Sequence, residues 1–590
     1  MPVFYSISRR APSTIAAAAL ALAACLLVLL TAPVAEAAVS GFVRDADTSM
    51  PLAGASVHLQ ADTSTVVVSA ADGSFDLPVT FAGFAVITAA LTYDAGASTN
   101  YNTGAAFAMD GTSGIEILLQ SIPSADNPSY SPPEAGLCGS CHGDQFSQWQ
   151  TANHSLAGTD EWVLDLFSGT GTAGGSAGYV FTDLHDPGET GFCATCHAPM
   201  EDVFDPGNVM LDEVSTLGGL DGVSCLACHQ MDSVNDNVDA LHHLGNSTYR
   251  FPDERPFFDT WQFVWGPLDD VSFGGMRAAY APHFRESRMC ASCHQYVNPD
   301  TGAPGQNTYG EWLASPFSVP GPTFQSCQDC HMPPADTDGT VCVLGDSPTR
   351  PAQQRRQHTF IGATPTTLAD AILLDASALD GAGLLQVTAA VTNEGAGHAF
   401  PSGVSIRNAL LVIEASYDGT PLNQVSGPVV PFWADDEVPG QQPGDYADYP
   451  GKGFAKILEG RINGTGPTVR PVLFIDAEGV FSDTLIPSGA TDVTTVEFQL
   501  PPEAEPGDLV DVTVRLLYRR AFRALAVTKG WDQTPQGGPV EIEVARQDLS
   551  LPLTGGPLPP AEIPTAGSIG LLLLALLLAA GALLRLRRAA

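Results

Sequence analysis

The chain has 590 residues, of which 44% are apolar and 8% aromatic, a composition typical of a globular protein with several domains. Its 25 basic and 65 acidic residues give a formal net charge of −40. So negative a surface repels nucleic acid and anionic lipid and favours basic or dipolar partners. Nucleic-acid binding is therefore excluded.

The N-terminus has the pattern of an export signal. Arg9 and Arg10 precede an apolar run over residues 15–30, and Ala35-Glu36-Ala37 is a small-x-small cleavage site. We therefore expect residues 1–37 to be a signal peptide that is removed when the protein is exported.

Residues 38–120 show the alternation and the turn signals of short β-strands. Val57 and Leu59 alternate with His58, and Asp72-Gly73 predicts a turn. Because His58 lies in the polar phase of its strand, we expect it to be exposed and not to be a ligand. The segments 41–43, 52–57 and 72–75 resemble the carboxypeptidase regulatory-like β-sandwich. That resemblance implies a small accessory module without catalysis of its own.

Five Cys-x-x-Cys-His motifs are the most specific feature of the sequence. In c-type haem attachment the two thiols bind the haem covalently and the histidine binds its iron. Zinc sites use paired Cys-x-x-Cys units, which fits poorly with an odd number of units that each end in histidine. We therefore predict five covalent haems c. The expected attachment residues are Cys138, Cys141, Cys193, Cys196, Cys225, Cys228, Cys290, Cys293, Cys327 and Cys330, and the expected proximal iron ligands are His142, His197, His229, His294 and His331.

All five motifs lie within residues 134–362, which follow a Ser/Pro linker at 121–133. This segment lacks long periodic helices or strands and could not bury a conventional apolar core. Five haems would supply the missing apolar mass. We therefore predict a pentahaem cytochrome c domain over residues 134–362.

A β pattern returns at residues 363–550, where Val387, Ala389 and Val391 alternate with polar neighbours. This pattern predicts a second β-sandwich. A Pro-rich linker at 551–566 follows it.

Residues 567–590 are expected to form a C-terminal transmembrane helix. The run from Ile569 to Leu584 is almost wholly apolar and would rise about 24 Å. The arginines that follow it would stay on the cytoplasmic side. Together with Ile563-Pro564-Thr565, the segment also resembles the sorting tails of bacterial surface proteins. We expect a periplasmic or cell-surface protein that is anchored in the membrane by this span.

The distal iron ligands are harder to infer. A helix from His142 to His154 would rise about 18 Å, so these two histidines could not bind one iron, and His154 is expected at a different haem. The same argument separates His283 from His294. His398 lies in a glycine-rich loop between strands, either exposed or as a distal ligand that joins the C-terminal sandwich to the haems. Weaker candidates are His185, His242 and His243, and the thioether alternatives are Met200, Met289 and Met332.

Several short segments carry a resemblance to a known family. Gln148-Trp149, Gly222-Val223-Ser224, residues 311–315 and residues 327–333 resemble the multihaem cytochrome c family, which includes the tetrahaem electron acceptor of hydroxylamine oxidoreductase. The resemblance implies mostly bis-histidine haems that are stacked in close pairs and pass electrons singly. It also implies that His154, His283 and His358 are distal ligands.

The predicted fold class is multidomain: a mainly irregular or helical multihaem cytochrome c domain flanked by two β-sandwich domains, with one C-terminal transmembrane helix. Single-electron transfer is the favoured function, because seven further histidines are available for five irons. The partners would be redox proteins, either other cytochromes or a quinol-oxidising system. No catalytic residue is assigned, and whether the chain is an enzyme is left open.

Two alternatives remain. The first is an oxidoreductase that acts on a small nitrogen or sulfur compound at one five-coordinate haem. Such a site needs cations near the open iron, and the candidates are Arg250, Arg277, Arg285 and Arg288. The second alternative is a surface binding module.

Overall fold

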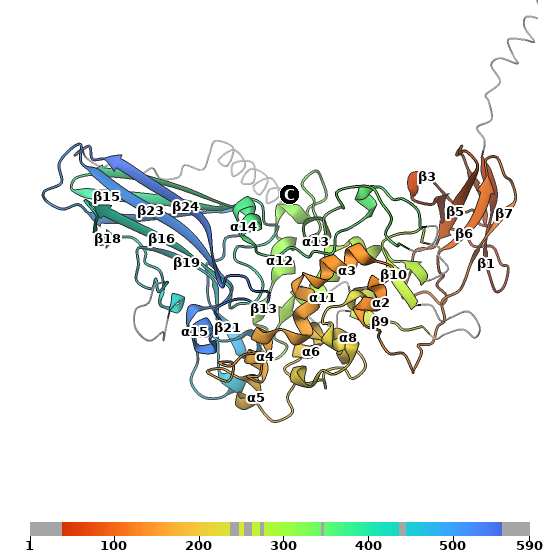
Figure 1. The fold of residues 1–590 in the computed structure, drawn as a ribbon, viewed down its shortest axis with the longest axis horizontal. Helices are drawn as coiled ribbons and strands as arrows, with labels where there is room; N and C mark the ends of the chain where they lie inside the picture. Colours follow the sequence, from red (N-terminus) through yellow and green to blue (C-terminus); the bar gives the residue numbers. More distant parts are fainter. Residues whose placement is uncertain are drawn as a thin grey trace, which may run out of the picture.

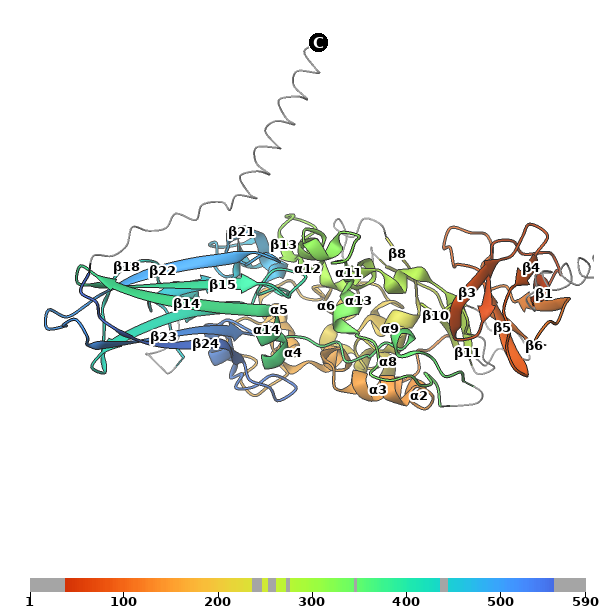
Figure 2. The ribbon, with the colours of Figure 1, turned by 90° about the horizontal axis from the view of Figure 1, so that it is seen from above.

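The computed structural model describes residues 38–235, 247–252, 262–271, 276–343, 347–435 and 444–556. The described chain forms three parts in a row (Figure 1). Small sheets lie at one end, short helices and strand pairs in the middle, and long sheets at the other end, and Figure 2 shows the same order from above. The expected signal peptide and the expected span at 567–590 lie outside the described residues.

The N-terminal part consists of two small sheets that pack against each other. One sheet has the strand order β4-β1-β7 and the other β3-β2-β5-β6. Side chains such as Val43, Val57 and Ile117 are fully buried in the apolar core that both sheets line. The strands are β1 (Val39–Asp45), β2 (Ser56–Leu59), β3 (Asp62–Val68), β4 (Ser74–Leu77), β5 (Phe84–Ala90), β6 (Gly104–Met109) and β7 (Ile115–Leu119).

His58 departs from the expectation of an exposed side chain. It lies on the outer face of its sheet, opposite the core residue Val57, but its side chain is 0% exposed. The carboxylate of Asp269 covers it, 3.2 Å from Nε2, and Nδ1 lies 2.8 Å from the carbonyl oxygen of Leu59. The strand alternation gave the face correctly, but it could not show which distant segment packs on that face.

The middle part contains short helices, the longest of which (α3 and α11) have 8 residues. The α-helices are α2 (Ala135–Gly139), α3 (Gly143–Gln150), α4 (Glu161–Phe167), α5 (Phe181–Leu184), α6 (Cys193–His197), α7 (Pro199–Asp202), α8 (Leu217–Leu220), α9 (Cys225–His229), α11 (Ser287–His294), α12 (Thr308–Leu313) and α13 (Cys327–His331). The 3-10 helices are η1 (Asn153–Thr159), η2 (Leu211–Glu213), η4 (Pro282–Arg285), η5 (Pro316–Ser318) and η6 (Ala352–Gln354).

Strands also occur in this middle part, in three two-stranded sheets. They are β8 (Met231–Val234) with β9 (Ser247–Tyr249), β10 (Gln262–Gly266) with β11 (Met276–Tyr280), and β12 (Tyr296–Val297) with β13 (Pro304–Gln306). These strands have two to five residues, too few to produce a readable alternation in the sequence.

The predicted fold class is therefore wrong. The described chain has many β-strands in several sheets, including sheets within the motif-bearing part, and only short helices. No helix in the described ranges is long and apolar enough to cross a membrane. The prediction failed in the middle part because a sequence without long helical or strand periodicity can form short paired strands as well as irregular chain.

The C-terminal part is built on two larger sheets. One has the order β14-β15-β22-β18; the other has the order β17-β16-β23-β24, with β19 also paired to β16. A separate hairpin joins β20 and β21. The elements are α14 (Pro365–Ala371), β14 (Ile372–Gly381), β15 (Leu384–Asn393), β16 (Asn408–Tyr417), β17 (Thr420–Pro421), β18 (Gln424–Ser426), η7 (Phe432–Ala434), β19 (Gly451–Phe454), β20 (Lys456–Gly460), η8 (Ile462–Gly464), η9 (Phe474–Asp476), β21 (Ala477–Asp483), β22 (Thr491–Gln499), β23 (Leu509–Arg519), α15 (Arg523–Lys529) and β24 (Glu541–Pro552).

The burial patterns of two strands explain how these sheets pack. In β15 every second residue is buried, because one face lines the core between the sheets and the other is partly solvated. In β16, by contrast, Leu411 and Ile413 enter that core while Leu410 and Val412 enter a second apolar cluster. Because each face of β16 packs into one of these two apolar clusters, the strand needs apolar residues at nearly every position.

Lys529 and Trp531 attach the C-terminal part to the middle part. The buried ammonium of Lys529 donates to the carbonyl oxygens of Asp165, Gly175 and Tyr179. Trp531 donates from Nε1 to the carboxylate of Asp165 over 2.6 Å and stacks on Trp162 with ring centres 4.4 Å apart. The buried charges are thus fully hydrogen-bonded, as burial requires.

A buried ion pair within the middle part holds a carboxylate that binds the N-terminal part. Arg350 binds Asp270 through two hydrogen bonds of 2.9 and 2.7 Å, and both side chains are only 2% exposed. Asp270 also accepts from the backbone N–H of Ala61, in the turn between β2 and β3. With the neighbouring contact of His58 and Asp269, these bonds fix the small sheets against β10 and β11.

Candidate functional site

Four of the five motifs lie on short helices, whereas in the first motif only Cys138 is helical and Cys141 and His142 lie between α2 and α3. In α6, α9 and α13 the helix begins at the first cysteine and ends at the histidine, and α11 also ends at its motif histidine. Residues i, i+3 and i+4 of a helix share a face. One helical turn is therefore enough to present both thiols and the imidazole to the same space.

In four motifs a backbone carbonyl holds the histidine at Nδ1. Because a carbonyl can only accept, Nδ1 must carry the proton, and the other nitrogen, Nε2, is left as the basic atom that can bind a metal. The pairs are His142 with Val341 (2.7 Å), His197 with Ala157 (3.1 Å), His229 with Trp265 (2.8 Å) and His331 with Ile361 (2.6 Å).

His294 differs from the other motif histidines in its Nδ1 partner. Its Nδ1 lies 3.0 Å from Nε2 of Gln306, in β13. Burial lowers the pKa of His294 to about 3, so its ring is neutral at pH 7. A neutral imidazole is the form that binds a metal.

The structure places His154 opposite His294. Their ring centres are 6.3 Å apart and their planes are inclined by 46°. Burial lowers the pKa of His154 to about 4, and its Nδ1 is buried without a hydrogen-bond partner. This geometry agrees with the expectation that His154 is a distal ligand at a motif other than the first, which is its neighbour in the sequence.

His398 lies opposite His331 in a similar way. The ring centres are 6.4 Å apart and the planes are inclined by only 7°. Nδ1 of His398 lies 3.0 Å from the carbonyl oxygen of Ala399, so Nε2 is again the free nitrogen. The loop histidine is therefore not a solvent-exposed side chain; burial lowers its pKa.

Both separations fit an iron atom between the rings. A metal held by Nε2 of two facing imidazoles separates their ring centres by about 6 Å, because each metal–nitrogen bond is about 2 Å and each nitrogen lies about 1 Å from its ring centre. The measured 6.3 and 6.4 Å match this value. The spacing of these rings is therefore compatible with an iron held between two imidazoles at the fourth and fifth motifs.

His358 lies close to two motif histidines, His229 and His142. Burial lowers its pKa to about 4, and the charges of His229 and His142 act in the same direction. Nδ1 lies 3.0 Å from the carbonyl oxygen of Arg356, and the backbone N–H of His358 donates to Gln148. Its free Nε2 makes His358 a ligand candidate for the first or the third motif.

Two other candidates have their coordinating nitrogens occupied. His283 uses Nε2 at 3.1 Å from the carbonyl oxygen of Met231. His185 has both nitrogens engaged, Nδ1 with the carbonyl oxygen of Phe181 and Nε2 with the carboxylate of Asp476. Neither is paired with a motif histidine in the described chain, and His242 and His243 lie outside the described residues.

The methionines and arginines considered from the sequence have other partners. Met200 and Met289 are buried in separate apolar clusters, and Met332 caps α13 directly after the motif histidine. The four arginines bind protein groups: Arg250 the carboxylate of Asp126, Arg277 the side chain of Gln120, Arg285 the carbonyl oxygen of Pro267, and Arg288 the carboxylate of Glu286.

Cysteines of different motifs touch one another. The side chain of Cys138 lies beside that of Cys225, which brings the first motif next to the third. Cys290 lies beside Cys327 and Cys293 beside Cys196, so the fourth motif is next to both the fifth and the second. The charge of Cys228 in the third motif also acts on Cys290 and Cys293 in the fourth, which brings the two groups of motifs near each other. α2 packs directly on α9, and α11 packs directly on α13.

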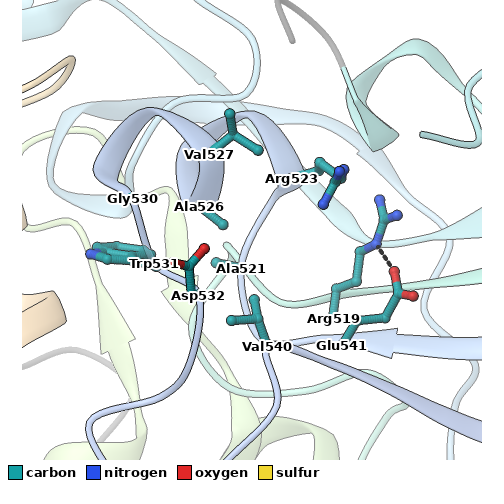
Figure 3. A pocket seen from close by; sticks show the side chains of 10 residues that line it. All are labelled: Arg519, Ala521, Arg523, Ala526, Val527, Gly530, Trp531, Asp532, Val540 and Glu541. Atoms are coloured by element: carbon teal, nitrogen blue, oxygen red, sulfur yellow. Dashed lines mark hydrogen bonds and ion pairs between the residues drawn. The ribbon is translucent and has the colours of Figure 1, made fainter. Parts of the chain in front are cut away.

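A pocket beside α15 lies outside this cluster. It has a volume of about 280 Å³ and is lined by residues of β23, α15 and β24 and the chain between them. Figure 3 shows Arg519 paired with Glu541 on one side of it and Trp531 on the other. No histidine or cysteine lines it, so it is not part of the candidate site.

Residues 137–230 match the family model described as cytochrome c554 and c-prime, a stretch that includes the first three motifs. The match supports one assignment. These residues resemble a multihaem c-type cytochrome, and the match supports covalent haem c, electron transfer and an exported protein at this coarse level.

Among solved structures, the chain is similar to a penta-haem cytochrome c552 from Thermochromatium tepidum, with 19% identity over 71% of this chain and 99% of that chain and a TM-score of 0.47. A second match is a protein described as AvmM, which catalyses macrocyclization in alchivemycin A biosynthesis, with 13% identity over 32% of this chain and 92% of that chain and a TM-score of 0.15. No curated protein matches the chain.

Sequence patterns do not indicate which groups orient the motif histidines. The carbonyl partners of His142, His197, His229 and His331 lie 199, 40, 36 and 30 residues away along the chain. A backbone carbonyl has no sequence signature, so no pattern could have identified these partners.

Proposed function

We propose that the chain is a pentahaem c-type cytochrome that transfers single electrons outside the cytoplasm, with one haem c at each motif. Two pairs of imidazole rings carry this proposal. The ring centres of His294 and His154 are 6.3 Å apart at the fourth motif, and those of His331 and His398 are 6.4 Å apart at the fifth. Two protein ligands on an iron leave no position for a substrate. Such an iron is suited to electron transfer rather than to catalysis.

When bound, haem c supplies an iron that alternates between the ferric and ferrous states and so carries one electron. The protein holds the imidazoles in place by hydrogen bonds from Nδ1 to fixed carbonyl groups, such as those of Ile361 and Ala399. These bonds strengthen the imidazoles as donors. Bis-histidine ligation lowers the haem potential relative to a methionine ligand.

Contacts between motif cysteines support short steps between haems. A cysteine sulfur is bonded to the edge of its haem, so two touching cysteines bring the edges of two haems together. Cys138 and Cys225 would join haems one and three, Cys196 and Cys293 haems two and four, and Cys290 and Cys327 haems four and five. Because the charge of Cys228 acts on Cys290 and Cys293, the third haem would also lie near the fourth, and we propose that the fourth haem is the branch point of the relay.

The fifth motif is the best candidate for electron exchange with a partner. Cys330 is exposed, whereas the other motif cysteines are half-buried. The strongly negative chain would attract a basic partner. We propose another cytochrome or a quinol-oxidising system in this role.

A second candidate function rests on the second motif. His197 has the carboxylate of Asp160 as its charged neighbour, and the nearby His185 is bound to Asp476. Among the described residues, no further histidine is placed against His197, whereas His358 lies near both His142 and His229. An oxidoreductase that acts on a small nitrogen or sulfur compound at an open second haem is therefore the alternative.

Electron paramagnetic resonance of the oxidised full chain, integrated against a chemical haem count, tests both. Five haems that are all low-spin support the relay. Four low-spin haems and one high-spin haem support the alternative, and small nitrogen and sulfur oxyanions would then be tested as ligands. Fewer than five haems per chain would refute the pentahaem assignment.

A further inference from the structure

The loop that carries His398 connects β15 with β16 and is held at its base by the C-terminal part. Asn393, which is 0% exposed, donates from Nδ2 to the carbonyl oxygen of His398 over 2.8 Å and to that of Ile486 over 3.0 Å. The backbone of Phe400 exchanges two hydrogen bonds with Ile486. These bonds fix the two ends of the loop to the sheet but do not aim the imidazole.

The rest of the loop is bound by Glu311, which belongs to α12 in the motif-bearing part. Its Oε2 accepts from the Ser402 hydroxyl over 2.6 Å and from the Ala399 N–H over 3.3 Å. Its Oε1 lies 3.4 Å from the ammonium of Lys456, in β20. The Glu311 side chain is only 11% exposed, so its charge depends on these partners.

Ala399 links this carboxylate to the imidazole. Glu311 accepts from its N–H, and the carbonyl oxygen of the same residue lies 3.0 Å from Nδ1 of His398. The peptide groups on both sides of one residue therefore connect Glu311 to the ring that faces His331. The neighbouring hydroxyls of Thr308 and Ser402, 3.2 Å apart, add a second contact between α12 and the loop.

We propose that Glu311 is a positioning residue for the iron ligand His398. The inference rests on the proposed function, because it requires a haem at the fifth motif. In it, Glu311 holds the loop so that Nε2 of His398 points at the space before His331. The fifth haem is then shared between two parts of the chain, and its ligation depends on a hydrogen bond across their boundary.

The ion pair with Lys456 does not by itself explain the position of the Glu311 carboxylate. The ammonium is closest to Oε1, whereas both loop contacts use Oε2. A carboxylate that served only to neutralise Lys456 would not need to contact Ala399 and Ser402. In Glu311→Gln the amide oxygen can still accept hydrogen bonds from the loop, although the negative charge is lost. This variant therefore distinguishes a positioning role from an effect of charge.

The test uses the full-length holoprotein with Glu311→Ala, Glu311→Gln and His398→Ala. Each is examined by electron paramagnetic resonance in the oxidised state and by haem count. We expect His398→Ala to convert one low-spin haem to high-spin. Glu311→Ala should keep all haems but lose part or all of the same low-spin signal, and added imidazole should restore it. Glu311→Gln should retain most of the signal, because its amide oxygen still accepts.

The matched control is Glu459→Ala, which removes the exposed ion pair of Glu459 and Arg470 in the same C-terminal part. It should leave the spectrum unchanged. If Glu311→Ala does not fold, Ser402→Ala, which removes one of the two loop contacts, should shift the same low-spin signal.

The outcomes separate the two claims. If His398→Ala leaves the spectrum unchanged, His398 is not an iron ligand and the proposed ligation at the fifth motif fails. If His398→Ala removes a low-spin haem while Glu311→Ala or, where that variant does not fold, Ser402→Ala leaves the spectrum as in the wild type, the ligation stands and the positioning role of Glu311 is refuted.

Discussion

The imidazole rings of His331 and His398 face each other with ring centres 6.4 Å apart and planes only 7° from parallel. One ring comes from the last Cys-x-x-Cys-His motif and the other from a loop of the C-terminal sheets. Each has its Nδ1 on a backbone carbonyl, so both have Nε2 available for the same iron. In the proposed relay, the C-terminal sheets would therefore contribute an iron ligand to the fifth haem and would not be only a neighbouring module.

Replacing His398 by methionine should raise the potential of one haem. A thioether is a weaker donor to ferric iron than imidazole, so the reduced state is favoured. We expect an upward shift on the order of 0.1 V in one of the haem transitions. A spectroelectrochemical titration of the holoprotein measures it. Unchanged potentials in all transitions would show that His398 is not bound to iron.

Replacing His154 by alanine should produce one high-spin haem, because His294 would lose the ring opposite it. The double variant with His398→Ala should produce two, since the two pairs belong to different motifs. Integration of the high-spin signal in electron paramagnetic resonance counts them. His185→Gln is the control: both its nitrogens are hydrogen-bonded, so the spin count should stay at the wild-type value. Equal counts in the single and double variants would contradict two separate pairs.

Replacing Arg350 by methionine should weaken the attachment of the N-terminal sheets. Asp270 is only 2% exposed, and removal of one partner of a buried pair costs about 3–5 kcal/mol. Adding Asp270→Asn should recover much of this loss, because asparagine is neutral and still accepts from Ala61. Denaturant unfolding followed by circular dichroism measures both. The exposed pair of Arg461 and Glu478 gives a control, in which Arg461→Met should cause no measurable change. If Arg350→Met lost no more stability than Arg461→Met, the role of Arg350 in holding the N-terminal sheets would be contradicted.

The contact of His58 with Asp269 should make the N-terminal attachment pH-dependent. Burial alone would lower the pKa of His58, but the hydrogen bond to Asp269 and the charges of Asp269 and Asp270 raise it above the ordinary 6.5. A group with a raised pKa in the folded state stabilises fully below its unfolded value and loses that contribution as pH rises through the folded value. The attachment should therefore weaken above pH 6.5.

At low pH, the contribution of Asp269 to stability changes in the opposite direction with pH. Burial would raise the pKa of Asp269, but the hydrogen bond and charge of His58 hold it below the ordinary 3.8, so this contribution is lost as pH falls through that lowered value. The nearby Asp62, which also interacts with His58, acts in the same direction. Unfolding midpoints recorded across this pH range should decline on the alkaline side in the wild type and less so in His58→Gln. Identical profiles for the two proteins would refute the role of the pair.

Electron exchange with small carriers should depend strongly on salt. The formal charge of −40 attracts cationic carriers at a distance. The screening length falls from about 30 Å at 0.01 M salt to about 10 Å at 0.1 M. Stopped-flow rates with a cationic one-electron carrier should thus fall several-fold over this range, while those with an anionic carrier should rise. A flat rate for both carriers would show that net charge does not steer the encounter.

The sequence predicted the covalent part of the site, because Cys-x-x-Cys-His is a local pattern that one helical turn can display. It did not predict which histidine meets which motif. His154 and His398 reach their partners through the tertiary fold, and a glycine-rich loop such as 395–397 is compatible with an exposed or a buried histidine. The structure also turns His283 and His185 toward protein groups that the sequence could not identify.

The fold itself was predicted unevenly for a similar reason. Regular alternation in β15 is a long-range consequence of one buried face and could be read directly. The short strands between the motifs, such as β12 and β13, are defined by their pairing and not by their composition. Glu311 lies in the segment 311–315 that resembles known multihaem cytochromes, but only its contacts with Ala399 and Ser402 suggest a role for it.

Anomalous X-ray diffraction at the iron absorption edge from crystals of the holoprotein tests the central claim most directly, because it locates the irons without assumptions about the ligands. We predict five iron peaks per chain, one midway between Nε2 of His331 and Nε2 of His398 and another midway between Nε2 of His294 and Nε2 of His154. A different number of peaks, or peaks displaced from these two midpoints toward one ring, would contradict a pentahaem relay with bis-histidine ligation at the fourth and fifth motifs.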